Sequence, residues 1–348
     1  MGFQLVSNDF GVDLGTSNVL IYVDDKGIAI RESSIVAVDK NTGKVLKVGS
    51  AARNMLGRTP GNVVAMHPLK DGVICDLELT VKMLQILFQS ATKASFFAPK
   101  PRVIISVPCS ITEVEERTVI NAALEAGARR VYLIEEPLAA ALGAGLDIAN
   151  ANGHMVVDIG GGTTDIAVLT MNNVAVSAST KIAGNAFDEA IARYIRYKYG
   201  IIIGRTTAED IKIQIGCVYP RREDISMVVK GREVKTGIPR EISVMSSEIY
   251  EVLRKPAAII VDEILSVLQD TTPELVGDIA ENGITLTGGC SQLAGMAQLL
   301  SEGTGIACTV ADNPESCVAL GCGKSLGWIN HLPEGPVNIA RKRIMRQG

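Results

Sequence analysis

Two stretches of the sequence share a pattern suited to a negatively charged ligand. Residues 156–169 read VVDIGGGTTDIAVL and residues 10–23 read FGVDLGTSNVLIYV. In each stretch, an apolar run leads into an aspartate. Glycine and small polar residues come after it, and then a second apolar run begins. Glycine lets the backbone approach a phosphate closely because no side chain holds it away. Turns of this kind also present free backbone N–H groups and hydroxyls to an anion.

Together the two turns predict a site for a polyphosphate and a cation. The expected phosphate-binding residues are Gly15, Thr16, Ser17 and Asn18 in the first turn and Gly160, Gly161, Gly162 and Thr163 in the second. Asp13 and Asp158 each follow an apolar run, so their carboxylates would face one point and call for Mg²⁺, held largely through water. Either turn alone fits an ordinary hairpin equally well, but the repeat weakens that alternative.

A third glycine turn, LTGGCSQLAGM at 286–296, leads from a strand into a helix. Such a turn suits a nucleoside, because the backbone can pass close to the base or ribose. Its candidate residues are Gly288, Gly289, Cys290 and Ser291. Alone the signal is weak, since strand–glycine–helix turns are common. GCGKS at 321–325 is a poorer candidate, because Val318 stands where a P-loop needs its first glycine. We expect this segment to be helical, with Lys324 solvated.

The composition limits the class of protein. The 348 residues exceed one ordinary core, and 47% of them are hydrophobic, which predicts a globular chain of at least two domains. The net charge of −4 argues against general nucleic-acid binding. Seven cysteines without a CxxC pair, and three scattered histidines, predict reduced and mostly buried thiols and no zinc site. With no signal peptide or membrane span, we expect a cytosolic protein.

The elements that must position these residues alternate between strands and helices, which predicts an α/β fold. Expected strands cover 10–13, 18–23, 27–31, 34–38, 44–48, 103–108, 131–134, 155–159, 165–170, 174–180 and 283–289. Two helices are expected to begin near Thr80 and at the capping box Thr112–Glu115. Further helices are expected over about 185–199, 206–216, 247–269 and 314–330. Charged and β-branched residues are more frequent in region 217–245, which predicts a small strand-rich subdomain there. Two halves that begin alike predict an internal duplication around a cleft.

With these motifs in place, the chain resembles the superfamily of actin, sugar kinases and DnaK-type chaperones, and within it the bacterial actin homologues of the MreB/Mbl family. The resemblance covers nearly the whole chain. It is carried by GVDLGTSN, LKDGVICD, KPRVIISVP, LIEEPLAAALGAG, MVVDIGGGTTDIAV, TTAEDIKI and GITLTGG. GRTPGNVVA at 57–65 and DGVICD at 71–76 are particular to this family.

The resemblance implies an actin-like fold, with two related lobes of ribonuclease-H-like βββαβα cores around a nucleotide cleft. It implies a first core of 1–35, 71–149 and 314–348 with a small subdomain at 36–70, and a second core of 150–181 and 246–313 with a small subdomain at 182–245. The first two turns would bind the β and γ phosphates of ATP, or the β phosphate of ADP, and the third would line the adenosine.

The resemblance also assigns roles to single residues. Glu136 and Thr163 would hold the water that attacks the γ phosphate, with Glu136 orienting rather than deprotonating it. Glu209 and Lys212 would lie beside the purine and ribose, although their i, i+3 spacing alone fits a surface ion pair. The family usually has a third glycine where this chain has Cys290. We therefore expect altered nucleotide affinity or selectivity, but a retained site.

Assembly and membrane contact are further implications of the resemblance. Copies of the chain would associate head to tail into protofilaments, which pair, at the inner face of the cell membrane. Phe96 and Phe97 beside Lys93, Lys100 and Arg102 would insert into the anionic leaflet, unless the two rings pack onto the lobe. The basic tail, ARKRIMRQG, would add attraction or stay merely solvated. Membrane proteins of the cell-shape machinery are further possible partners.

Two alternative functions stay open at this point. A scaffold of the same fold would bind nucleotide without hydrolysing it, and no motif excludes this. A chaperone of the superfamily would hydrolyse ATP for another purpose, and a sugar kinase would use ATP to phosphorylate a small substrate. The chaperone would need a peptide-binding domain, for which too few residues follow the last expected helix. The sugar kinase would need a substrate pocket, for which the sequence has no signal.

Overall fold

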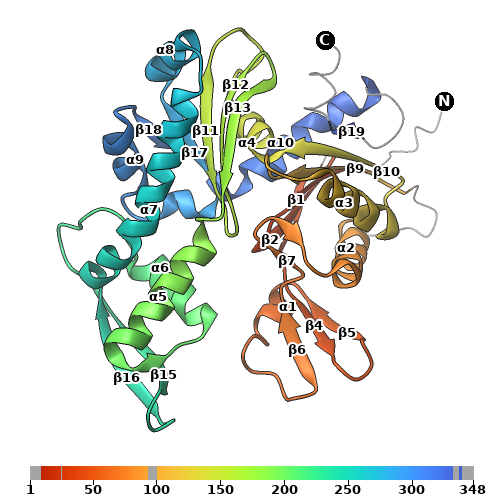
Figure 1. Cartoon of the computed structure of the whole chain (residues 1–348). Helices are drawn as coiled ribbons and strands as arrows, with labels where there is room; N and C mark the ends of the chain where they lie inside the picture. The colour runs from red at the N-terminus through yellow and green to blue at the C-terminus, as the bar shows by residue number, and fades with distance from the viewer. Residues whose placement is uncertain (1–8, 25, 93–99, 332–336, 339–348) are drawn as a thin grey trace.

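The computed structural model describes residues 9–24, 26–92, 100–331 and 337–338, and two large sheets organise it (Figure 1). The first sheet has the order β19-β10-β9-β1-β2-β3. Its strands are β1 (Phe10–Leu14), β2 (Asn18–Val23), β3 (Gly27–Ser33), β9 (Arg102–Val107), β10 (Arg130–Glu135) and β19 (Val337–Asn338). Strands β1, β2 and β3 form an antiparallel meander, whereas β9 runs parallel to both β1 and β10.

The second sheet repeats this arrangement in the order β13-β12-β11-β17-β18. Its strands are β11 (His154–Ile159), β12 (Thr164–Thr170), β13 (Asn173–Thr180), β17 (Ile284–Thr287) and β18 (Cys308–Val310). Here β11 to β13 form the meander and β17 runs parallel to β11 and β18. The predicted duplication is therefore present in the topology, and the fold is α/β as expected.

A smaller sheet accompanies each large one, and we call the two resulting halves lobe I and lobe II. In lobe I it is β5-β4-β6, and in lobe II it is β14-β15-β16. Their strands are β4 (Val36–Asp39), β5 (Val45–Val48), β6 (Val63–Met66), β14 (Ile201–Ile202), β15 (Ser226–Glu233) and β16 (Pro239–Met245). A two-stranded ribbon, β7 (Leu69–Lys70) with β8 (Val73–Ile74), leads back into lobe I.

Helices cover the sheets. Lobe I contains α1 (Ser50–Arg53), α2 (Leu77–Thr92) and α3 (Glu113–Glu125). Lobe II contains α5 (Gly184–Tyr199), α6 (Arg205–Ile215), α7 (Ser246–Gln269), α8 (Pro273–Asn282) and α9 (Met296–Thr304). The predicted capping box is confirmed: Glu115 N donates to Thr112 Oγ1 at 3.3 Å, and Thr112 N donates to the Glu115 carboxylate at 2.9 Å.

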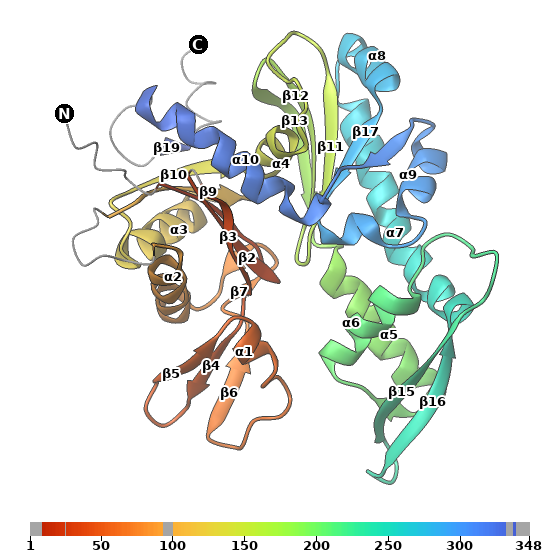
Figure 2. The ribbon, with the colours of Figure 1, turned by 180° about the vertical axis from the view of Figure 1, so that it is seen from behind.

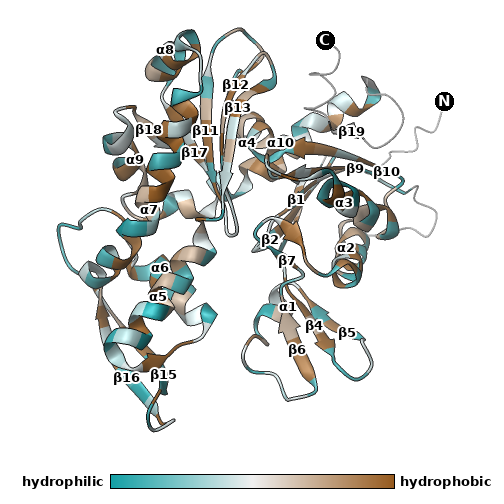
Figure 3. Ribbon diagram, viewed as in Figure 1, coloured by the Kyte–Doolittle hydropathy of each residue, from teal (hydrophilic) through white to brown (hydrophobic). Residues whose placement is uncertain are grey.

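The two lobes meet at a pair of crossing helices, α4 (Glu136–Ala144) and α10 (Cys317–Lys324). Both pack into one core with apolar residues of the two large sheets, including Ile104 on β9 and Val156 on β11. Figure 3 shows hydrophobic residues along β9 and β10 at the centre of lobe I. The predicted helix over 314–330 is wrong in extent, because short 3-10 turns flank α10 on both sides.

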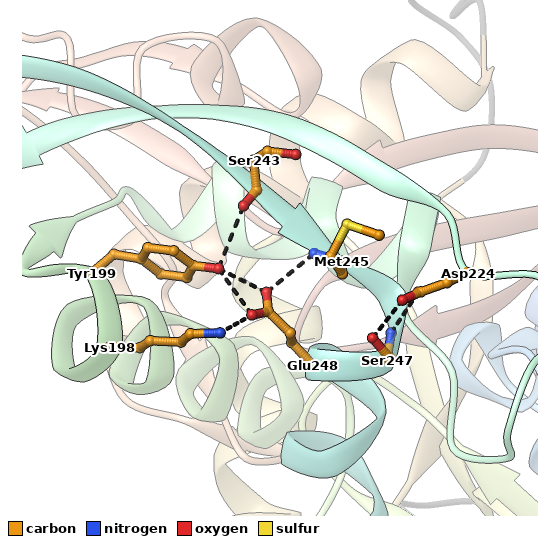
Figure 4. A network of polar contacts seen from close by, with 7 residues as sticks. All are labelled: Lys198, Tyr199, Asp224, Ser243, Met245, Ser247 and Glu248. Carbon is orange, nitrogen blue, oxygen red and sulfur yellow. Dashed lines mark hydrogen bonds and ion pairs between the residues drawn. The ribbon is translucent and has the colours of Figure 1, made fainter.

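A network of polar contacts connects α5 to α7 in lobe II (Figure 4). The Tyr199 hydroxyl donates to Glu248 at 2.8 Å, and Lys198 forms an ion pair with the same carboxylate. Glu248 also accepts from Met245 N at 3.1 Å, which caps the first turn of α7. These contacts hold helix α5 and the small sheet of lobe II to α7, the long helix of this lobe.

Candidate functional site

A cavity of about 660 Å³ lies between the lobes, and all three glycine turns contribute to its wall. It brings together most of the residues that the sequence singled out. From the predicted set it is lined by Asp13, Gly15, Thr16, Ser17, Asn18, Glu136, Asp158, Gly160, Gly161, Gly162, Thr163, Glu209, Lys212, Gly288, Gly289 and Cys290. Asp13 and Cys290, which are far apart in the sequence, thus share one site.

The first two turns approach each other so closely that the second one requires glycine. A Cβ atom on Gly161 would collide with the Ser17 side chain, and one on Gly162 with the Thr16 side chain. Thr16 is further fixed because its hydroxyl accepts a hydrogen bond from Gly72 N at 2.9 Å. The β1–β2 and β11–β12 turns therefore face each other, as the repeated pattern predicted.

Two aspartates form the floor of the cavity at the strand ends. Burial, with Asp158 nearby, raises the pKa of Asp13 to about 8, although Arg31 opposes the shift. Burial also raises the pKa of Asp158 to about 7, although the Thr287 hydroxyl donates to its carboxylate at 2.7 Å. Two buried carboxylates, of which Asp158 raises the pKa of Asp13, are the hard oxygen ligands that suit a divalent cation. Thr287 had no assigned role in the sequence.

Glu136 is the first residue of α4 and is buried beside three other carboxylates. Burial raises the pKa of Glu136 well above the usual value, and the nearby carboxylates of Asp165, Asp158 and Asp13 raise it further. Asp165 is fully buried and accepts from Cys109 N at 3.1 Å. It stands at the end of the GGGTTD motif, but the sequence alone did not indicate that it would lie beside Glu136.

Glu209 and Lys212 do not form the surface ion pair that their spacing allows. Lys212 is buried, lies 2.8 Å from Asp188 on α5 and donates to the Gly184 carbonyl at 3.1 Å. Glu209 instead pairs with Arg53 of lobe I at 2.6 Å. Asp188 and Arg53 both line the cavity. Neither was predicted, because each partner is distant in the sequence.

The third turn requires glycine at position 288, and its other candidate residues differ in whether they line the cavity. Gly288 has φ of 79°, and a Cβ atom there would collide with the backbone of Ile159. Cys290 faces the cavity close to Lys212. Ser291 is buried and donates to the Gly288 carbonyl at 2.7 Å, so it supports the turn and does not line the cavity. Its expected contact with a nucleoside stays a prediction.

Other predictions concern regions away from the cavity. GCGKS lies partly within α10 and Lys324 is exposed, so its dismissal as a phosphate loop is confirmed. Phe96, Phe97 and the basic tail with Arg341, Lys342, Arg343 and Arg346 fall outside the described residues. Within the described part of the chain, no helix is long and apolar enough to cross a membrane, and no three His, Cys, Asp or Glu side chains cluster as metal ligands.

Comparison with known proteins identifies the family. The family model described as "MreB/Mbl protein" matches residues 7–333. The chain belongs to the MreB/Mbl family. It is 49% identical to the cell shape-determining protein Mbl of Bacillus cereus, covering 95% of this chain and 99% of that relative. It is 48% identical to the cell shape-determining protein MreB of Escherichia coli K12, covering 94% of this chain and 95% of that one.

Solved structures of MreB relatives agree with the fold. MreB5 of Spiroplasma citri bound to ADP superposes with a TM-score of 0.88 at 35% identity, covering 99% of this chain and all of that one. The same protein bound to AMPPNP gives a TM-score of 0.87. A chain of the MamK double helical filament has the same fold, with a TM-score of 0.77 at 23% identity, over 94% of this chain and 100% of its own.

Proposed function

We propose that this MreB/Mbl family member binds and hydrolyses ATP and assembles into membrane-associated filaments that support cell shape. The observation that carries the proposal is the pair of glycine turns that face each other across one cavity, with Asp13 and Asp158 between them. The ADP and AMPPNP complexes of the Spiroplasma relative support a nucleotide as the ligand.

The two turns would hold the β and γ phosphates through backbone N–H groups and the hydroxyls of Thr16 and Ser17. Asp13 and Asp158 would hold Mg²⁺, with water and phosphate supplying the remaining ligands, since no group of three or more His, Cys, Asp or Glu side chains among the described residues is arranged to hold a metal ion by itself. When bound, Mg²⁺ would supply the positive charge that offsets both the carboxylates and the phosphates. The donor set therefore fits the ion.

Glu136 would orient the attacking water, together with the Thr163 hydroxyl. Its position at the start of α4 fixes its backbone, and its burial excludes bulk water from the reacting end of the cavity. Burial raises the pKa of Glu136, and the neighbouring carboxylates of Asp165, Asp158 and Asp13 raise it further. A cation held by Asp13 and Asp158 would favour the charged form of Glu136, which can accept a hydrogen bond from water.

The nucleoside would lie between the third turn and α6. Lys212, anchored by Asp188, would line its pocket, and Glu209 would face the ribose. Cys290 stands where a third glycine is usual in the family and narrows this end, which supports altered nucleotide selectivity. The four-part division into two cores and two small subdomains, with the boundaries expected from the sequence, belongs to the same proposal.

Self-association is proposed as a head-to-tail contact between copies, because a heterologous contact that does not close gives a filament. Family membership supports this contact and the placement at the inner face of the cell membrane. The placement would also bring the filaments to membrane proteins of the cell-shape machinery.

Phosphate release from ATP tests the proposal for hydrolysis. The wild-type protein with Mg²⁺ should release phosphate, and Glu136→Ala should lower the rate by about 100-fold or more. Thr163→Ala should also slow release, and both variants should retain ATP binding. A wild-type protein that binds ATP but releases no phosphate above background would establish the non-hydrolysing scaffold instead.

A further inference from the structure

One ion pair joins the two lobes across the cavity. Arg53 ends α1 in lobe I, and Glu209 lies on α6 in lobe II. Their Nη2 and Oε2 atoms are 2.6 Å apart. Both residues line the cavity. Figures 1 and 2 show α1 on the side of its sheet that faces α6, so the pair spans the cleft.

The pair lies at the outer end of the site. The Arg53 and Glu209 side chains are 36% and 29% exposed, whereas Asp158 and Glu136 at the inner end are buried. The inner ends of the lobes meet through the close approach of the glycine turns. The Arg53–Glu209 pair therefore lies at the side of the cavity that faces solvent.

Glu209 pairs with a cation of the opposite lobe although another cation lies on its own helix. Arg205 lies four residues before Glu209 on α6, the spacing at which ion pairs form within a helix. Glu209 pairs instead with Arg53 of the opposite lobe. Only one carboxylate oxygen, Oε2, takes part, and Oε1 has no hydrogen-bond partner among the described residues. That second oxygen is free to accept a ribose hydroxyl.

We propose that Arg53 is a positioning residue for the nucleotide: its ion pair with Glu209 holds the lobes closed over the nucleoside and slows release. This inference rests on the proposed nucleotide binding. A nucleotide can leave only when the outer ends of the lobes part, and parting breaks the pair. Entry is affected less, because the open state has already lost the contact. The same ion pair orients Glu209 so that its free oxygen faces the ribose.

The size of the effect follows from the partial exposure of the pair. Ion pairs of this kind contribute modestly, so loss of the contact should speed release about two- to fivefold. Salt screens exposed charges. The difference between the wild type and an Arg53 variant should therefore shrink at high salt, which a purely structural role of Arg53 would not produce.

Release of tritium-labelled ADP, chased with excess unlabelled ADP in the presence of Mg²⁺, tests the inference. Arg53→Ala and Glu209→Gln should each release ADP faster, and the double variant should be no faster than the faster single one, because both remove the same contact. Arg53→Lys should recover part of the slow release. The matched control is Lys230→Ala, which breaks the Lys230–Glu241 ion pair within lobe II at 2.8 Å and should leave release unchanged.

The outcomes separate this inference from the proposed function. A wild-type protein that retains no labelled ADP would contradict nucleotide binding itself. A wild type that retains ADP while Arg53→Ala releases it at the same rate would overturn the role of Arg53. Additive effects in the double variant would also overturn it, because Glu209 would then act on the nucleotide independently of Arg53.

Discussion

At the scale of single residues, the carboxylates on the cavity floor are the most informative feature. Burial is the main cause that raises the pKa of Asp13 to about 8 and that of Asp158 to about 7, from an ordinary aspartate value of 3.8. Such shifts are common where a protein prepares a site for a charged ligand. The cation-free cleft therefore carries a cost in electrostatic free energy that a bound cation would relieve.

These shifts predict how the stability of the cation-free protein depends on pH. Between about pH 4 and pH 8 the folded protein retains protons on Asp13 and Asp158 that the unfolded chain has released, so the free energy of unfolding falls as the pH rises. Urea unfolding in the presence of a chelator should show this fall, and Asp158→Asn should reduce it. Added Mg²⁺ should stabilise the protein more at the upper end of the range. An identical pH profile for wild type and variant would contradict the prediction.

The site was predictable where its signal was local and was missed where it depended on distant partners. The turns at Gly15 and Gly160 are visible because aspartate, glycine and hydroxyl residues follow one another within a few positions. Asp188 and Arg53 contact Lys212 and Glu209 only through tertiary structure. The sequence position of Ser291 shows that it belongs to the third turn, but not that its side chain is buried and donates to the Gly288 carbonyl.

At the scale of elements, the crossing of α4 and α10 depends on glycine. A Cβ atom on Gly321 would collide with the Ala139 carbonyl across this crossing. Gly321→Ala should therefore destabilise the protein by about 1–3 kcal/mol or more, because neither helix backbone can move aside easily. The control is Gly277→Ala in α8, where an added Cβ meets no atom within 4 Å. That change should be neutral or stabilising, by up to about 1 kcal/mol. Equal effects of the two substitutions in chemical unfolding would rule out this account of the crossing.

The long helix α7 shows why some elements were predictable. Ile249, Leu253, Ala257, Ile260 and Ile264 recur at helical spacing and are fully buried. This pattern outweighs Pro256 within the helix, because burial of the apolar face stabilises it more than one lost backbone hydrogen bond costs.

One residue on this face gives a test. Leu253→Ala should lower the free energy of unfolding by about 2–5 kcal/mol, since it removes a buried side chain and leaves a cavity. Val228→Ala, at a position that is 62% exposed on β15, should change it by less than about 0.5 kcal/mol. Unfolding by urea measures both, and a small loss for Leu253→Ala would contradict the packing described.

Other elements were missed for physical reasons. Helices α8 and α9 are short, with only Ile279 buried in the first and Met296 and Leu300 in the second. Strand β6 has no fully buried residue and is fixed by its pairing with β4. The expected helix over 314–330 breaks into α10 and flanking turns, where the chain passes between the lobes.

At the scale of the whole molecule, the proposed membrane contact gives a separable prediction. Burying a phenylalanine contributes roughly 1.5–3 kcal/mol, whereas attraction between basic residues and anionic lipid weakens with salt. If Phe96 and Phe97 insert, binding to anionic liposomes should have a salt-resistant part that Phe96→Ser with Phe97→Ser removes. Co-sedimentation at low and high salt measures this. Unchanged binding of the double variant at high salt would refute insertion.

The central claim is that the duplicated turns and their two aspartates form one Mg²⁺-dependent nucleotide site. Calorimetric titration of the wild type, Asp13→Ala and Asp158→Ala with ATP, with and without Mg²⁺, tests it most directly. The account predicts that the wild type binds ATP much more tightly with Mg²⁺ and that each variant loses most of that gain. Unchanged affinity for ATP with Mg²⁺ in both variants would contradict it.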